Sequence, residues 1–247
     1  MPKDSEVLEC YETLLAEGKI QENKILKTSL ITRKVRSESG VTPFAVMTKP
    51  YPCPGQCTYC PLEVGMPKSY LSDEPAAARA KSFGFDPARQ ISSRLKQLEI
   101  TGHPTDKIEI IVIGGTFGSY PEEYKREFFL AMINTINDQV SDSLIQAQEL
   151  NESSPRRIVG MSIETRPDWI DEAEVKLMRE LGVTKVQLGV QALDDEIMEH
   201  IKRGHTLRDV ATATQLLKDA GIKVCYHFMP NLPGSTPEHD LEMAHTM

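Results

Sequence analysis

Short apolar runs alternate along this chain with longer amphipathic stretches. The runs are rich in isoleucine and valine and are bounded by glycine, proline or polar residues, as is typical of buried strands. They predict strands at residues 44–47, 107–113, 157–163, 185–191 and 223–229. Apolar residues at helical spacing predict helices at residues 1–18, 76–83, 86–98, 121–149, 171–181 and 206–221, with a break near Asp138 and one more helix from residue 236.

The regular alternation of strands and helices predicts an α/β fold with a parallel sheet and right-handed crossovers. Each predicted strand ends in polar or glycine residues, so we expect one functional face at the C-terminal ends of the strands. Five strands are too few to close a barrel of the usual kind. We therefore expect an incomplete (β/α) TIM-type barrel, and the final helix that stops at Met247 leads us to expect a fragment of a longer protein.

A basic segment precedes the first predicted strand. Residues 19–36 contain six lysines and arginines and a single acid, whereas the whole chain has a net charge of −8. The acidic total argues against a general nucleic-acid binder, because phosphate contacts need a local excess of cations. We therefore divide the chain into a helical and basic N-terminal segment, residues 1–40, and a core domain, residues 41–247. The basic stretch is either an RNA-contacting element or a solvated linker.

Composition narrows the class of protein further. Apolar residues make up 40% of the chain and charged residues 26%, which excludes wholesale disorder. No apolar run approaches the roughly 20 residues needed to span a bilayer, so no membrane role is expected. Five cysteines are an odd number, and no secretory leader pattern opens the chain. We therefore expect a cytoplasmic protein with reduced thiols rather than a disulfide-bonded one.

Three of the cysteines lie within eight residues, with the spacing C-x3-C-x2-C. Cys53, Cys57 and Cys60 stand on a loop rich in proline and glycine, where thiolates can converge on a soft metal or an iron–sulfur cluster. A structural zinc site normally closes with four protein ligands, so zinc would need a distant residue such as Cys10, Cys225 or a histidine. Three cysteines on a 4Fe-4S cluster leave one iron open for a substrate or cofactor.

Other polar residues follow the predicted strands. The triplet Gly114-Gly115-Thr116 ends the second strand, and by itself it is also typical of a plain turn. His227 on the fifth strand is typical of a packing residue. Arg166 and Arg203 are candidates either for steering phosphates or for ion pairs.

The cysteine spacing, with Tyr59 just before the third cysteine, resembles the cluster loop of radical S-adenosylmethionine (SAM) enzymes. Within that class, the chain resembles the family of the catalytic subunit of Elongator and its archaeal and bacterial single-chain relatives. The resemblance runs from about residue 34 to residue 237. Beyond the cysteine loop it rests on residues 46–50, 106–109, 114–117, 163–168, 189–191, 203–206 and 229–233.

The resemblance implies a radical SAM domain that works with a C-terminal acetyltransferase domain, which this sequence lacks. It implies an enzyme that forms a carboxymethyl group at carbon 5 of the wobble uridine of tRNA. Its cofactors would be a 4Fe-4S cluster and SAM, and its cosubstrate acetyl-CoA. The SAM-derived radical would take hydrogen from the acetyl group, and the resulting carbon radical would add to the uracil. Its partners would be the tRNA anticodon loop and a reductant for the cluster.

The resemblance also implies roles for particular residues. The cluster ligands would be Cys53, Cys57 and Cys60, and Lys107 would be a catalytic residue associated with acetyl-CoA. SAM would be bound by Tyr59, Gly114, Gly115, Thr116, Glu164 and Gln191. For tRNA we expect contacts from the basic segment, beside the cysteine face, through Lys24, Lys27, Arg33, Lys34 and Arg36.

Two other interpretations stay open. Another radical SAM enzyme, similar to coproporphyrinogen oxidase, also places a tyrosine before the third cysteine. A zinc-stabilised RNA-binding module is the interpretation that involves no enzyme.

Overall fold

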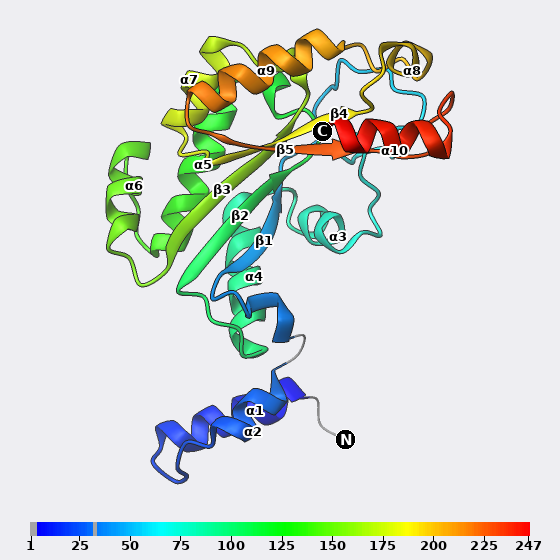
Figure 1. Ribbon diagram of the computed structural model, residues 1–247. Helices are drawn as coiled ribbons and strands as arrows, with labels where there is room; N and C mark the ends of the chain where they lie inside the picture. Colours follow the sequence, from blue (N-terminus) through cyan, green and yellow to red (C-terminus); the bar gives the residue numbers. More distant parts are fainter. Residues whose placement is uncertain (1–3, 32–33) are drawn as a thin grey trace.

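The computed structural model of the chain describes residues 4–31 and 34–247, without the side chains of Ser5, Lys34 and Arg36. Within these residues, five parallel strands form one open sheet in the order in which they occur along the chain (Figure 1). The α/β fold and the incomplete barrel expected from the sequence are confirmed. The strands are β1 (Thr42–Met47), β2 (Lys107–Ile113), β3 (Arg157–Thr165), β4 (Lys185–Gln191) and β5 (Lys223–Phe228).

Helices connect consecutive strands and flank the sheet. They are α1 (Asp4–Ala16), α2 (Lys24–Leu30), α3 (Pro75–Ser82), α4 (Pro87–Ile100), α5 (Glu122–Asn137), α6 (Leu144–Glu152), α7 (Glu172–Glu180), α8 (Asp195–His200), α9 (Leu207–Asp219) and α10 (Pro237–Thr246). Three single turns of 3-10 helix lie between them, η1 (Lys34–Ser37), η2 (Phe117–Ser119) and η3 (Pro167–Trp169). None of the described helices is long and apolar enough to cross a membrane.

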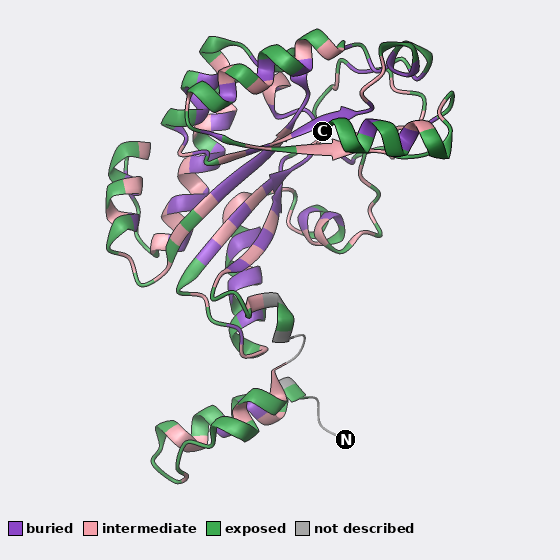
Figure 2. Cartoon of the chain, in the orientation of Figure 1, coloured by how far each residue is buried: buried purple, intermediate pink, exposed green. Residues whose placement is uncertain are grey.

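The two faces of the sheet differ in chemistry. Ile108, Ile110 and Val112 of β2 pack with α4 and α5 in the main core, which also includes Phe129 and is buried in Figure 2. Near the carboxyl ends of β3 and β4 the alternate positions Ser162, Glu164, Gln187 and Gln191 are polar and lie on the other face. Phe129 is completely buried, and its truncation to alanine would cost about 3–5 kcal/mol of stability. Toward the carboxyl ends of β1 and β2 this second face is apolar, because Met47 and Ile113 pack there with Ala77 and Ala80 of α3. The sheet thus has one face covered by the main core and a second face that is polar at β3 and β4.

Local capping explains where the sequence-based prediction and the structure differ. The predicted helix 121–149 is two helices, because Asp138 adopts a left-handed conformation with φ 54° and ends α5. The expected break near Asp138 is therefore confirmed. Helix α2, inside the basic segment, was not predicted; the side chain of Asn23 caps it by accepting a hydrogen bond from Leu26 N. Helix α8 was not predicted either, and Asp194 caps it in the same way.

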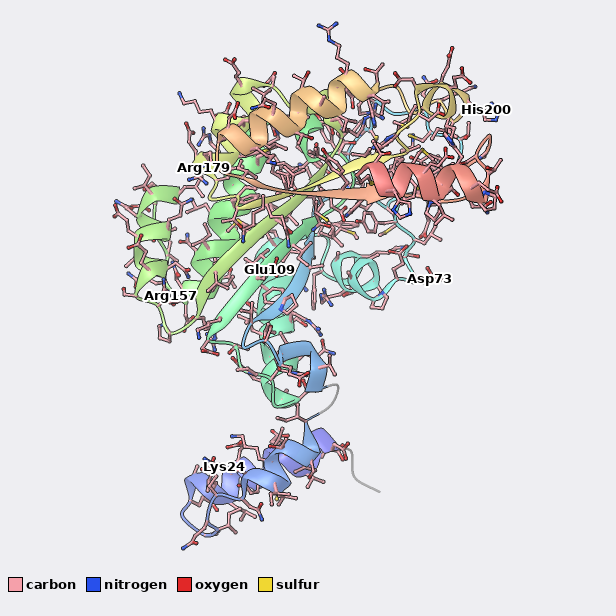
Figure 3. The ribbon with its side chains drawn as sticks, viewed as in Figure 1. Lys24, Asp73, Glu109, Arg157, Arg179 and His200 are labelled. Carbon is pink, nitrogen blue, oxygen red and sulfur yellow. The ribbon has the colours of Figure 1, made fainter. Side chains whose placement is uncertain are left out.

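The N-terminal helices α1 and α2 lie side by side at the amino ends of the strands (Figure 1). Helix α1 contacts the end of α4, where Leu8 and Ile31 approach Gly102. Figure 3 places Lys24 of α2 at the opposite end of the molecule from His200 of α8. The basic segment therefore does not lie beside the cysteine face, and our expectation of that position was wrong.

Candidate functional site

A cavity of about 650 Å³ opens at the C-terminal ends of the strands, within the size range of small-molecule sites. Its walls come from the loop between β1 and α3, the turn after β2, and the last residues of β3, β4 and β5. Of the residues expected from the sequence, the cavity gathers Cys53, Cys57, Tyr59, Cys60, Gly115, Thr116, Glu164 and Gln191. Residues far apart in sequence thus meet at one edge, as parallel strands require.

Each of the three thiols meets a polar group from a different part of the wall. Cys53 Sγ lies 3.4 Å from Thr116 Oγ1, and Cys60 Sγ lies 3.1 Å from Ser69 Oγ. Arg203 Nη1 donates to Cys57 Sγ at 3.4 Å. Burial raises the pKa of the Cys57 thiol, but the hydrogen bond and positive charge of Arg203 outweigh burial, so its pKa lies below the ordinary value. The site therefore favours a thiolate at Cys57, the form that binds iron.

The arrangement of the thiols bears on which metal centre fits. A single tetrahedral zinc ion binds its sulfurs at about 2.3 Å and so draws them close together. Among the described residues, no three histidine, cysteine or acidic side chains are grouped closely enough to hold one ion. In a four-iron cluster each cysteine binds a different iron, so the sulfurs lie further apart. Three thiols around one cavity, each with a polar neighbour, fit such a cluster.

The glycine turn after β2 has a conformation that other residues adopt only with strain. Gly114 has a φ of +136° and Gly115 a φ of +94°. A side chain on Gly114 would collide with Thr48 Oγ1, and the Cβ of a residue at position 115 would lie 3.2 Å from the carbonyl oxygen of Lys68. The two glycines therefore let the backbone of this turn approach the cavity, while the turn also packs against the cysteine loop.

Glu164 is a partly buried carboxylate near the end of β3. Tyr70 Oη donates to Glu164 Oε2 at 2.5 Å, and burial raises the pKa of Glu164 above its ordinary value. An ammonium group that entered the cavity would compensate the negative charge of this side chain. Glu164 thus suits the amino group of SAM, the role implied by the family resemblance.

Gln191 ends β4 in a left-handed conformation, with φ 74°, at an irregularity in the pairing with β5. Its carbonyl oxygen accepts from Met229 N at 2.8 Å, so the strained residue is tied to the strand next to it. Strain in a non-glycine residue that lines a cavity is typical of a functional position. Tyr59 also lines the cavity, and burial raises the pKa of its hydroxyl.

Sequence reasoning missed several residues of the cavity. Lys68 and Tyr70 come from the loop after the third cysteine, which carries no pattern that points inward; Lys68 Nζ donates to the carbonyl oxygen of Gly55. His227, expected to be a packing residue, lines the cavity and shares a hydrogen bond of 2.8 Å with Gln187 Oε1. Alternation along β4 would have identified Gln187, because it shares a face with Gln191.

Lys107 is not part of this site. It is the first residue of β2, it is exposed, and it pairs in register with Arg157, which Figure 3 shows at the start of β3. A strand rises about 3.3 Å per residue, so Lys107 lies about 20 Å from the carboxyl end of β2. A contact between Lys107 and acetyl-CoA stays a prediction, and it would take place at the opposite edge of the sheet from the cysteines.

The basic segment is partly neutralised by one acid of α1 and by Glu17, which follows that helix. Lys27 Nζ lies 2.7 Å from Glu12 Oε1, and Lys19 Nζ lies 2.9 Å from Glu17 Oε2. Lys24 is exposed on α2. Arg33 lies outside the described residues, as do the side chains of the other two cations assigned to tRNA, Lys34 and Arg36.

The fold and the site define an α/β protein that gathers three thiols and a glycine turn at the carboxyl edge of an open parallel barrel, as enzymes with a three-cysteine iron–sulfur centre do. The family model of the radical SAM superfamily matches residues 51–247, and the chain belongs to that superfamily.

Named relatives are more specific. The chain is 49% identical over 209 residues to a tRNA uridine(34) acetyltransferase of Dehalococcoides mccartyi, covering 85% of this chain and 46% of the relative. It is 36% identical over 236 residues to human Elongator complex protein 3, covering 90% of this chain and 43% of that protein. The solved structure of archaeal Methanocaldococcus infernus Elp3 with an N-terminal deletion superposes with a TM-score of 0.69 and 42% identity, over 83% of this chain and 41% of that one. The chain thus spans less than half the length of these relatives.

Proposed function

We propose that this chain is the SAM-cleaving part of an enzyme that modifies carbon 5 of the wobble uridine in tRNA. The observation that carries the proposal is one cavity in which three cysteine thiols, the glycine turn and the partly buried carboxylate of Glu164 meet. The relatives named tRNA uridine(34) acetyltransferase and Elongator complex protein 3 support the choice of tRNA as the substrate.

In this proposal the chain's own residues bind and orient. Cys53, Cys57 and Cys60 would hold a 4Fe-4S cluster, which when bound supplies the electron that cleaves SAM to a 5′-deoxyadenosyl radical. Backbone groups at Gly115 and the carboxylate of Glu164 would orient the methionine part of SAM. The walls of the cavity would keep water away from the reactive carbon.

The later steps belong to the proposal for the whole enzyme. Hydrogen would be taken from the acetyl group of acetyl-CoA, and the resulting carbon radical would add to carbon 5 of the uracil. Loss of one electron to the oxidised cluster and of the proton on carbon 5 would restore the ring, and hydrolysis of the thioester by water would release coenzyme A and leave a carboxymethyl group. A one-electron reductant and the tRNA anticodon loop would be the partners. The acetyltransferase names of the relatives support acetyl-CoA as the cosubstrate. A cytoplasmic location stays a prediction.

The test of the proposal is anaerobic reconstitution followed by SAM cleavage. We expect about four irons per chain and, with dithionite, the release of 5′-deoxyadenosine. Cys53→Ala should abolish both, whereas Cys225→Ala, which removes an exposed thiol outside the cavity, should abolish neither. One equivalent of zinc without iron would refute the enzyme and leave the zinc-stabilised RNA-binding module.

The acetyl-CoA step has a separate test. If the radical takes hydrogen from the acetyl group, acetyl-CoA with a deuterated methyl group should transfer deuterium into 5′-deoxyadenosine, and mass spectrometry would detect it. Coproporphyrinogen in place of acetyl-CoA should leave the rate of SAM cleavage unchanged. Stimulation by the porphyrinogen, with no deuterium transfer from acetyl-CoA, would instead favour the enzyme similar to coproporphyrinogen oxidase.

A further inference from the structure

Arg166 is a buried cation behind the cysteine loop, and part of its hydrogen-bonding capacity is unused. It follows β3, its side chain is 5% exposed, and it lines the cavity. Its Nη1 atom is buried and has no hydrogen-bond partner among the described residues. A buried, charged N–H group without an acceptor destabilises the fold. We therefore expect an acceptor that is not part of the chain, such as a bound group in the cavity.

The direction of Nη1 is set by two glycines. A Cβ atom on Gly55 would collide with Arg166 Nη1 and would lie 3.5 Å from Cys53 Sγ. A Cβ atom on Gly204 would lie 3.2 Å from Arg166 Nη2. The guanidinium therefore occupies a slot between the cysteine loop and the segment that follows α8. Cys53 Sγ borders the same space at Gly55.

The rest of the guanidinium is fixed from behind. Arg166 Nε and Nη2 donate to the two carboxylate oxygens of Asp168, each at 2.8 Å, in a bidentate pair. His205 Nδ1 lies 4.0 Å from Asp168 Oδ1. Burial, followed by the charge of Arg203, lowers the pKa of His205 to about 4, so this ring is neutral at neutral pH. Asp168 is thus left to pair with Arg166, and the bidentate geometry orients Nη1.

We propose that Arg166 is a positioning residue, which places a fixed N–H and a positive charge beside the cysteine loop that would hold the iron–sulfur centre. It would hold the cysteine loop in place and favour the reduced state of the centre. Arg203, which donates to Cys57 Sγ, would supply a second positive charge beside the same loop. This proposal rests on the iron–sulfur part of the proposed function and is independent of tRNA and acetyl-CoA.

The effect on reduction follows from charge. A core with two positive charges and three thiolates carries one net negative charge, and one electron from the reductant raises that to two without breaking any bond. A nearby guanidinium stabilises the more negative state, and a hydrogen bond to sulfur acts in the same direction. Removal of Arg166 should therefore make the reduction potential more negative.

The experiment compares Arg166→Met and Arg166→Lys with wild type and with Lys125→Met. Lys125 is a matched control, because it is also a buried cation with an acidic partner, Glu174, but it does not line the cavity. Each chain is reconstituted anaerobically without SAM. We would measure iron content, the unfolding midpoint in urea, and the midpoint potential by redox titration monitored by electron paramagnetic resonance.

We expect Arg166→Met to keep four irons and to show a more negative potential than both wild type and Lys125→Met. Arg166→Lys, which keeps the charge, should lie closer to wild type. Loss of iron in a folded Arg166→Met chain, with iron retained in Arg166→Lys and Lys125→Met, would equally support the proposal.

A wild-type potential in iron-loaded Arg166→Met would overturn the proposal. Unfolding of both Arg166 variants would also overturn it, because Arg166 would then serve only the fold. A wild-type chain that takes up no iron would overturn the proposed function as well.

Discussion

The ion pair between Arg166 and Asp168 allows a prediction about stability. Asp168→Ala removes both hydrogen bonds of the bidentate pair and leaves a guanidinium that is 5% exposed without its carboxylate. Breaking a buried pair by removing one partner costs about 3–5 kcal/mol. Because Asp168 is itself 24% exposed, water recovers part of that loss, and we expect about 3 kcal/mol. For a chain of this size, that corresponds to a fall of about 6–12 °C in Tm.

The assay is urea unfolding of the metal-free chain, followed by circular dichroism. The exposed Asp73, labelled in Figure 3, supplies the control, and Asp73→Ala should change the free energy of unfolding by less than about 0.5 kcal/mol. The double variant Arg166→Met/Asp168→Leu should recover most of the loss, because no buried charge is left without a partner. A loss below about 1 kcal/mol for Asp168→Ala would refute the conclusion that this pair stabilises the fold.

Three further predictions concern cofactor and RNA. Because burial raises the pKa of Glu164, the folded chain binds more protons there than the unfolded chain, so this residue destabilises the fold as pH rises above the ordinary glutamate value. Urea titrations from pH 5 to 8 should show that Glu164→Gln removes this loss of stability, and a steeper loss in the variant would contradict the assignment. The same substitution should also weaken SAM binding. Gly115→Val should keep the iron but lower SAM affinity at least tenfold in equilibrium dialysis. Valine is strained at a φ of +94°, and its side chain would crowd the carbonyl oxygen of Lys68. Unchanged affinity would make the turn purely structural. Lys24→Ser should lower the salt slope of tRNA binding by about one, and an unchanged slope would indicate a solvated linker.

The arrangement of the strands could be read from the sequence because period-two and near-continuous apolar patterns report burial directly. The cysteine loop and the residues that end β3 and β4 could also be placed together, because the carboxyl ends of parallel strands meet at one edge of the sheet. Tyr70 and Lys68 could not, because their contacts with Glu164 and Gly55 depend on how an irregular loop folds back. The position of the basic segment was misjudged because nearness in sequence to β1 indicates nothing about which end of the strand a preceding helix packs against.

The difference between the two faces of β4 and β5 has a consequence for how this protein can change over evolutionary time. Substitutions at Ile110 or Leu188 are judged by packing against helices, so few alternatives are tolerated. Gln187 of β4 and His227 of β5 lie on the opposite face of the sheet and are only partly buried. Their chemistry can be exchanged without repacking the core. A lineage can therefore retain the cysteine loop and the glycine turn while it acquires a different substrate through a handful of cavity-lining positions such as these.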